Sequence, residues 1–149
     1  MFVDQLKVGD EFNSPSKTIT DAHYLLFSGL TGDNHPSHYD VEYCRKTRYG
    51  KPVAHGLLVA SMGALGASSI SHHYHGLIFV EQGSRFLKPV FVGDTIYPGH
   101  VVEKTWQDAK QRDFIRFKAI IKNQRGETVM EGFHVYLIDR QPGEKKEGA

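Results

Sequence analysis

The chain has 149 residues, enough for one domain with a sizeable core, and its net charge of +1 gives no bulk attraction to nucleic acid or acidic membranes. A single cysteine excludes an internal disulfide and fits a reducing compartment. The first residues have no basic region followed by an apolar one, and no apolar run is long enough to span a bilayer, so we expect a cytoplasmic protein with neither a nucleic-acid nor a membrane partner.

The first part of the chain predicts a short strand or two and then a helix. Residues 2–19 alternate weakly between apolar and polar side chains, as short strands do. Residues 20–30 have the pattern of a helix, with Thr20 as the N-cap and Gly32 as the residue that ends it. One face of this helix is apolar, and we expect it to form a buried stripe of four side chains: Tyr24, Leu25, Phe27 and Leu30.

The next segment contains an acid and a histidine that a loop could direct at one point. Asp33 and His38 are five positions apart, a spacing that places side chains on different faces of a helix. Pro36 lies between them, disfavours a helix and biases His35 toward an extended backbone. We therefore expect a tight loop. A carboxylate and an imidazole aimed at one water molecule would form a general acid/base pair.

Two other interpretations of this loop remain open. Asp33 could cap a turn, and His38 could be a buried histidine bonded to the backbone. The loop could also hold a divalent ion, since imidazole and carboxylate suit several such metals, and the ligands would then be Asp33, His35, His38 and Asp40. The spacing is not a strong ligand signature, so we expect no metal here.

A second helix is expected to begin at Asp40, its N-cap, and to stop at Gly50. Its end is basic, with Arg45, Lys46 and Arg48 close together. Such a run is most simply a solvated helix end. The functional alternative is contact with the phosphates of a charged carrier.

Residues 56–70 predict a long helix of about 15 residues that is enclosed rather than half exposed. The segment is apolar almost all round, and its polar residues are serines. Its glycines cost roughly 1 kcal/mol each relative to alanine, which tertiary packing must offset. A helix of this length spans roughly 22 Å, a suitable width for a curved sheet to wrap.

The remainder of the chain is strand-like, in four runs at 76–88, 94–107, 112–123 and 127–138. Alternation is clearest in the third run, where one face is formed by Ile115, Phe117, Ala119 and Ile121. Because nothing helical separates these strands, they should pair as an antiparallel meander. One buried helix held in an antiparallel sheet is an α+β architecture.

The chain thus predicts one domain over residues 1–138, followed by a tail. Residues 139–149 are charged and lack large apolar side chains, a composition typical of a disordered end. Three histidines follow the long helix, at His72, His73 and His75. They most simply form an exposed loop, with incidental metal affinity or a substrate contact as the alternative.

Three motifs resemble those of the MaoC-like dehydratases, also called (R)-specific enoyl-CoA hydratases. They are G-D-N-H-P-S-H at 32–38, P-V-A-H-G-L-L at 52–58 and S-R-F-L-K-P-V-F-V-G-D at 84–94, within a resemblance that covers about residues 15–138. The resemblance implies a hot-dog fold, in which a long central helix lies in a curved antiparallel sheet. It also implies a homodimer, or a higher oligomer, with active sites near the subunit interface.

The family's hydration motif implies that Asp33 and His38 are the catalytic pair. The chain departs from the family pattern at His35, because the family has asparagine before the proline. The departure leaves the acid, the proline and the second histidine intact, so it bears on which acyl group is bound. We therefore count His35 among the candidate substrate-binding residues.

The resemblance in the second motif implies that His55 and Gly56 lie at the start of the central helix, and we count His55 among the candidate substrate-binding residues. A thioester oxygen that gains negative charge needs donors, and the backbone N–H groups of Gly56 or Leu57 at a helix N-terminus could provide them. The serine that follows in the family matches Ser61, one turn beyond Leu57. Ser61 could orient Asp33 or the water, or it could bond a backbone carbonyl within the helix.

Arg85 and Lys88 lie on a strand-like segment with two apolar residues between them. A solvated sheet face is the simpler interpretation. Contact with the phosphates of coenzyme A is the alternative.

The leading interpretation is a hydro-lyase, an (R)-specific enoyl-CoA hydratase or 3-hydroxyacyl-CoA dehydratase. It would add water reversibly to a trans-2-enoyl thioester, with Asp33 as base and His38 as proton donor, or with these roles exchanged. The CoA thioester is then the substrate, and no metal or redox cofactor is required. Two alternatives are thioester hydrolysis, which other hot-dog proteins perform, and non-catalytic binding of acyl-CoA.

Overall fold

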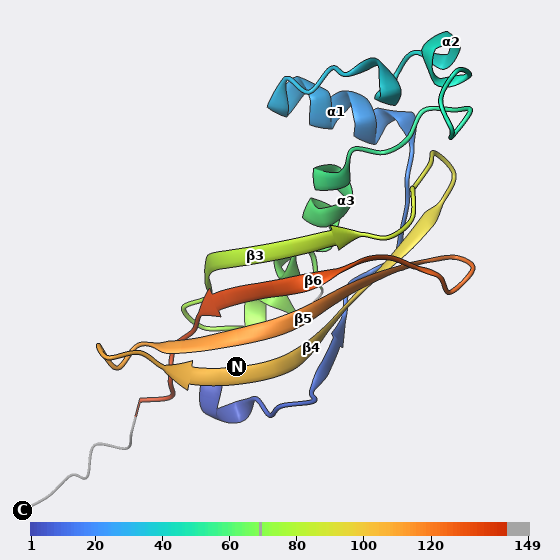
Figure 1. The fold of residues 1–149 in the computed structure, drawn as a ribbon. Helices are drawn as coiled ribbons and strands as arrows, with labels where there is room; N and C mark the ends of the chain where they lie inside the picture. Colours follow the sequence, from blue (N-terminus) through green and yellow to red (C-terminus); the bar gives the residue numbers. More distant parts are fainter. Residues whose placement is uncertain (69, 143–149) are drawn as a thin grey trace, which may run out of the picture.

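The computed structural model describes residues 1–68 and 70–142, in which one antiparallel sheet lies below a group of short helices (Figure 1). The strands are β1 (Glu11–Asn13), β2 (Lys17–Thr18), β3 (Ile78–Phe86), β4 (Thr95–Gln107), β5 (Asp113–Asn123) and β6 (Thr128–Leu137). The α-helices are α1 (Asp21–Thr31), α2 (Val41–Cys44) and α3 (Gly56–Met62), and 3₁₀ turns lie at Val3–Gln5, Pro36–His38, Leu65–Ala67 and Ser71–His73. The α+β class and the hot-dog arrangement of helix and curved sheet are confirmed.

The strand order is β1-β4-β5-β6-β3, with β2 also paired to β4. The predicted meander is confirmed for β4, β5 and β6 but is wrong for β3, which pairs with β6. The reason is the path of the segment that follows β3. Val90 O accepts from Ala54 N at 2.8 Å, and Asp94 O accepts from Ile19 N at 2.8 Å, so this segment is held by the residues that precede α3 and α1. The chain thus passes β6 and β5 before it enters the sheet as β4.

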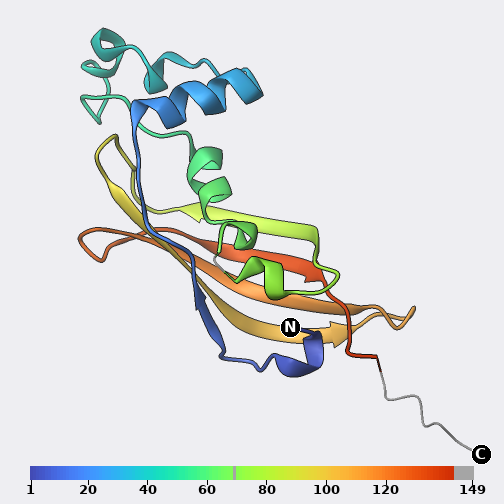
Figure 2. The same cartoon turned by 180° about the vertical axis from the view of Figure 1, so that it is seen from behind.

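The sheet buries one face, as the alternation in β5 predicts. Ile115, Phe117, Ala119 and Ile121 are each at most 1% exposed. The last two pack in a cluster with Leu58 of α3, and the first two pack in a second cluster toward the other end of the sheet. Figure 2 shows α3 and the turns after it lying over this face.

Helix α1 forms where the sequence predicts it, but its apolar face is mostly exposed. Thr20 is the N-cap, and Gly32 ends the helix with a φ of 75°, a left-handed conformation that suits glycine. Tyr24 is buried, whereas Leu25 and Leu30 are 64% and 85% exposed. The predicted buried stripe is therefore wrong for these two leucines, because α3 lies between α1 and the sheet (Figure 1).

Helix α2 begins at its predicted cap but is much shorter than expected. The Asp40 carboxylate accepts from Tyr43 N at 2.9 Å, as an N-cap does. The helix ends at Cys44 rather than continuing to Gly50. Thr47 explains the early end, because its hydroxyl donates to Cys44 O at 2.8 Å and competes with the helical backbone.

Helix α3 is also shorter than predicted, with seven residues instead of about 15. It ends at Gly63, and only isolated 3₁₀ turns follow within the described residues. Gly63 is buried against β5, where a Cβ would lie 2.6 Å from Ile121 Cδ1. The low helix propensity of the glycines is thus not offset over the second half of the segment, and the prediction of one helix over 56–70 is wrong.

The segment after β6 stays attached to the domain over its described part. Val3 N donates to Asp139 O at 2.9 Å, and Arg140 forms an ion pair with Asp113. The rest of the predicted tail, 143–149, lies outside the described residues. Within residues 1–68 and 70–142, no helix is both long enough and apolar enough to cross a lipid bilayer. The cytoplasmic location stays a prediction.

Candidate active site

The end of α1 and the loop after it position Asp33. Gly32 turns the chain sharply, and Asp33 N donates to Thr31 Oγ1 at 3.2 Å. The next residue, Asn34, accepts a hydrogen bond from the buried Ser28 hydroxyl on α1. The loop is thus fixed on both sides of Asp33, whose side chain is exposed to solvent.

His38 lies in the 3₁₀ turn Pro36–His38, and a hydrogen bond defines its ring. Its Nδ1 is 2.6 Å from Val53 O, a carbonyl that can only accept, so the proton is on Nδ1. In the neutral ring, Nε2 therefore has the free lone pair. This nitrogen accepts a proton when the ring is neutral and donates one when it is charged.

His55 is the N-cap residue of α3 and is only 2% exposed. Its ring stacks on that of His38, with centroids 3.8 Å apart and an interplanar angle of 22°. Its Nε2 is 3.1 Å from Asp33 O and 2.9 Å from the Tyr39 hydroxyl. Burial lowers the pKa of His55, and the nearby His38 ring lowers it further.

Asp33, His38 and His55 therefore meet at one place. One carboxylate oxygen and one nitrogen from each ring all lie within 4.8 Å of one another. The two catalytic residues implied by the sequence are together, at the start of α3.

The metal set considered from the sequence is not assembled. His35 is exposed and its Nδ1 is 2.8 Å from Ser37 Oγ, while Asp40 caps α2. His55 takes their place beside Asp33 and His38. Asp33, His38 and His55 could together hold a divalent ion, because one donor atom from each lies within 4.8 Å of the other two.

The start of α3 places the candidate oxyanion donors beside this cluster. Gly56 and Leu57 are the first two helical residues, whose N–H groups have no partner in a preceding turn. The Leu57 side chain is 62% exposed. Ser61 is exposed and its hydroxyl donates to Leu58 O at 2.8 Å, which is the structural alternative foreseen for it.

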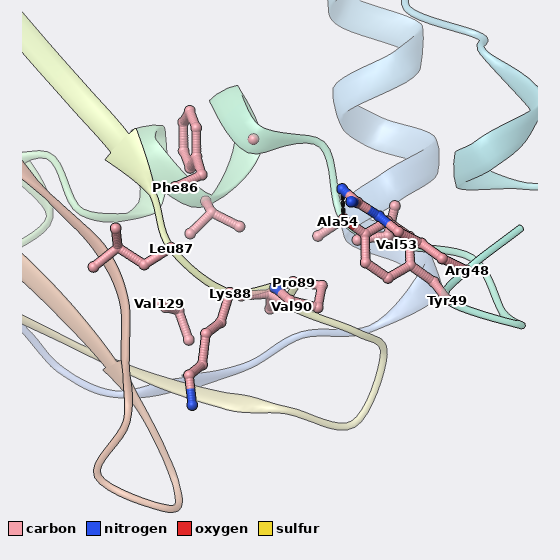
Figure 3. Close-up of a pocket in the computed structure, with 12 residues that line it drawn as sticks. Arg48, Tyr49, Val53, Ala54, Phe86, Leu87, Lys88, Pro89, Val90 and Val129 are labelled. Atoms are coloured by element: carbon pink, nitrogen blue, oxygen red, sulfur yellow. Dashed lines mark hydrogen bonds between the residues drawn. The ribbon is translucent and has the colours of Figure 1, made fainter.

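A cavity of about 330 Å³ lies on the other side of the segment that leads into α3. Figure 3 shows Arg48 and Tyr49 on one side of it and Phe86 and Leu87 on the other. Val53, Ala54 and Gly56 form the shared wall with the catalytic cluster.

The two candidate phosphate-binding residues are separated. Lys88 lines the cavity and pairs with Glu127. Arg85 lies in a different hollow and is 3.6 Å from Glu131. The basic residue that the structure adds to the cavity is Arg48, whose guanidinium lies 4.8 Å from the centre of the Tyr49 ring and donates to its hydroxyl at 2.7 Å.

Tyr39 is the site residue that sequence reasoning missed. Its hydroxyl is within 3.1 Å of Asp33 O, 2.9 Å of His55 Nε2 and 3.3 Å of Tyr24 O. Its place directly after His38, between that residue and the N-cap of α2, was the only hint. Nothing in the sequence indicates that its hydroxyl reaches a residue 16 positions away.

Comparison with known proteins identifies a family. The MaoC-like domain matches residues 4–123. The mitochondrial 3-hydroxyacyl-acyl-carrier-protein dehydratase of Arabidopsis thaliana is 30% identical over 85% of this chain and 74% of its own length. The (R)-specific enoyl-CoA hydratase of Rhodospirillum rubrum is 30% identical over 92% of this chain and 91% of its own length.

A solved structure has the same fold as this chain. The (R)-hydratase of Aeromonas caviae, described as involved in PHA biosynthesis, superimposes with a TM-score of 0.79 and 28% identity. The match covers 91% of this chain and 99% of that one.

Proposed function

This chain belongs to the MaoC-like domain family, and on that premise we propose that it is an (R)-specific enoyl-CoA hydratase, or 3-hydroxyacyl-CoA dehydratase when run in reverse. It adds water to a trans-2-enoyl thioester. The observation that supports this most directly is the meeting of Asp33 and His38 within 4.8 Å beside the start of α3.

Each catalytic residue has a defined task in the hydration step. The Asp33 carboxylate accepts a proton from water as the water oxygen forms its bond to the β-carbon. The double-bond electrons move toward the α-carbon and the thioester oxygen. His38, protonated on Nε2, donates that proton to the α-carbon, and transfer of a proton from Asp33 back to His38 restores both groups. Positioned acid/base groups typically contribute about 10² to 10⁴ in rate.

The thioester oxygen holds negative charge while the proton is in transit. We assign its stabilisation to the backbone N–H groups of Gly56 and Leu57, which lie at the start of α3. Losing one such donor typically costs about 10² to 10³ in rate. Position 56 needs a small residue, because a Cβ on Gly56 would lie 3.1 Å from the Phe86 ring.

The substrate is proposed to be a CoA thioester, and the acyl-carrier-protein thioester is the alternative within the same chemistry. The relatives that match this chain include an acyl-carrier-protein dehydratase and an enoyl-CoA hydratase. Lys88 and Arg48 are positively charged residues at the cavity beside Gly56 and are candidates for contact with carrier phosphates. Arg85 is a weaker candidate because it lies outside that cavity and pairs with Glu131.

We also propose that the functional form is a homodimer or a higher oligomer. Leu25, Leu26 and Leu30 give α1 an exposed apolar face, each being at least 64% exposed. Exposed apolar patches of this kind mark interaction sites. A second copy of the chain would remove this surface from water.

A crotonyl-CoA assay tests the proposed activity. Hydration removes the absorbance of the conjugated enoyl group and leaves the thioester intact, so no free thiol is formed. Release of thiol would instead establish the thioesterase alternative. Binding of crotonyl-CoA without either change would favour a non-catalytic acyl-CoA-binding protein.

A further inference from the structure

We infer that His55 is a positioning residue that holds both members of the catalytic pair, Asp33 through its backbone and His38 through its ring. The inference rests on the proposed function, because it concerns the same site. The proposed task does not involve contact with the substrate. The His55 side chain is buried, with 2% exposure, and so is shielded from it.

The first connection fixes Asp33. His55 Nδ1 is buried and has no hydrogen-bond partner among the described residues. A buried ring nitrogen without a hydrogen-bond partner costs less free energy as an unprotonated acceptor than as an N–H donor. A neutral imidazole has one N–H proton, which we expect on the nitrogen that has an acceptor nearby. The proton therefore belongs on Nε2, which is 3.1 Å from Asp33 O.

Tyr39 completes this anchor. Its hydroxyl is 3.1 Å from the same Asp33 carbonyl and 2.9 Å from His55 Nε2. With the proton of His55 on Nε2, the Asp33 carbonyl receives donors from both side chains. The backbone of the catalytic acid is thus tied to the N-cap of α3, although the two residues are 22 positions apart.

The second connection fixes His38. The His55 ring covers one face of the His38 ring at 3.8 Å, and Val53 O holds its Nδ1 at 2.6 Å. Stacking defines the plane of the His38 ring, and the hydrogen bond defines its rotation within that plane. Together they fix the His38 ring beside Asp33, with one ring nitrogen within 4.8 Å of a carboxylate oxygen.

The same burial also affects the charge of the His55 ring. Protonation of His55 would place a donor on Nδ1 against surroundings that offer no acceptor within the described residues. The buried Nδ1 thus disfavours a positive charge on His55, which agrees with the lowered pKa of this residue.

Two substitutions separate the two connections. His55→Phe keeps a flat ring for stacking but removes the donor to Asp33 O, and His55→Gln keeps an N–H donor but removes the ring. We expect each to lower kcat for crotonyl-CoA by about 10-fold to 100-fold with KM changed less than about threefold, since small misplacements of reacting groups cost rate. Tyr39→Phe, which removes the second donor, should lower kcat in the same way.

Non-additivity shows whether His55 acts through the pair. In an Asp33→Asn background, His55→Phe should cost less than about a further threefold, because the group it positions is already absent. The matched control is His134→Phe, which replaces another histidine that is 2% exposed but lies in the sheet, and it should leave kcat unchanged. An equal loss in both backgrounds, or no loss in either, would overturn the inference.

A readout without substrate separates this inference from the proposed function. Nitrogen NMR of the His38 ring should show the Nδ1–H tautomer in the wild type and in His55→Phe, and a mixture of tautomers in His55→Gln. A wild-type protein that shows this pattern but does not hydrate crotonyl-CoA or crotonyl-acyl-carrier protein would contradict the proposed function alone. A single tautomer in all three proteins, with hydration intact, would contradict the role of His55.

Discussion

At the scale of single residues, His35 stands where the family resemblance implies an asparagine. Its ring is exposed, its Nδ1 lies 2.8 Å from Ser37 Oγ, and its centroid is 6.3 Å from that of His38. The side chain therefore packs beside the catalytic ring without joining the Asp33–His38 contact. A substitution that keeps a short polar side chain should leave the pair in place.

We predict that His35→Asn, which introduces the asparagine that the resemblance implies, changes kcat for crotonyl-CoA by less than about threefold. Surface substitutions away from special features usually alter stability by at most about 0.5 kcal/mol, so the fold should be unaffected. Steady-state rates on enoyl-CoA substrates of different lengths would check this. A loss of tenfold or more on every substrate would show that His35 takes part in the chemistry.

The part of the site whose assembly could be predicted is the part that is local in sequence. Asp33 and His38 belong to one short motif, and Pro36 alone excludes a helix between them. The roles of Tyr39 and His55 could not be predicted, because they depend on α3 reaching the loop. Ser61 was ambiguous for the opposite reason, since a helical serine can always bond a carbonyl of its own helix.

At the scale of elements, strands β3 and β6 have glycines at adjacent positions of their ladder, Gly83 beside Phe133 and Gly132 beside Ser84. Gly132 faces β3 in a position where a Cβ would lie 2.0 Å from Gly83 O. The obstacle is backbone, which cannot yield without moving a strand. These glycines allow β3 to join the sheet at β6, the pairing that the sequence did not predict.

We predict that Gly132→Ala destabilises the protein by about 3 kcal/mol, because overpacking costs typically 1–3 kcal/mol and here the clash is with backbone. Urea unfolding midpoints would measure the change. The matched control is Gly29→Ala in α1, where a Cβ meets nothing within 4 Å. It should stabilise the protein by up to about 1 kcal/mol through helix propensity. Equal midpoints for the two variants would contradict this account of β3–β6 pairing.

Element boundaries were predicted well where a cap defines them and poorly where packing does. Thr20 and Gly32 bound α1 as expected, and Asp40 begins α2. The ends of α2 and α3 depend on the Thr47 hydroxyl and on how closely Gly63 approaches β5. The sequence pattern, basic around Thr47 and apolar around Gly63, predicts neither the Thr47 hydrogen bond nor the approach of Gly63 to β5.

At the scale of the whole molecule, the core of the sheet contains two histidines that must stay neutral. His100 and His134 are 1% and 2% exposed, with ring centroids 5.5 Å apart. Burial, reinforced by the neighbouring His134, lowers the pKa of His100 to about 4, and burial lowers the pKa of His134. The unfolded chain therefore binds protons at a higher pH than the folded protein does.

We predict that stability falls as the pH is lowered through the window from about 6.5 to about 4. Above this window both histidines are neutral in the folded and in the unfolded protein, so the stability is not reduced. Within the window only the histidines of the unfolded chain are protonated, and this favours unfolding. For His100 the difference from an ordinary value of 6.5 corresponds to on the order of 3 kcal/mol.

Urea midpoints at fixed protein concentration across this pH range would measure the effect. The matched variant His100→Gln does not titrate, so its midpoint should fall less steeply than that of the wild type. Identical slopes for the two proteins would show that His100 is not the source.

The most direct test of the central claim is the rate of crotonyl-CoA hydration by Asp33→Asn and by the wild type, measured side by side on protein with the same melting temperature. Asparagine keeps the shape of the side chain and removes the base, so we predict a rate lower by at least about 10². An unchanged rate would contradict the assignment of Asp33 as the residue that activates water.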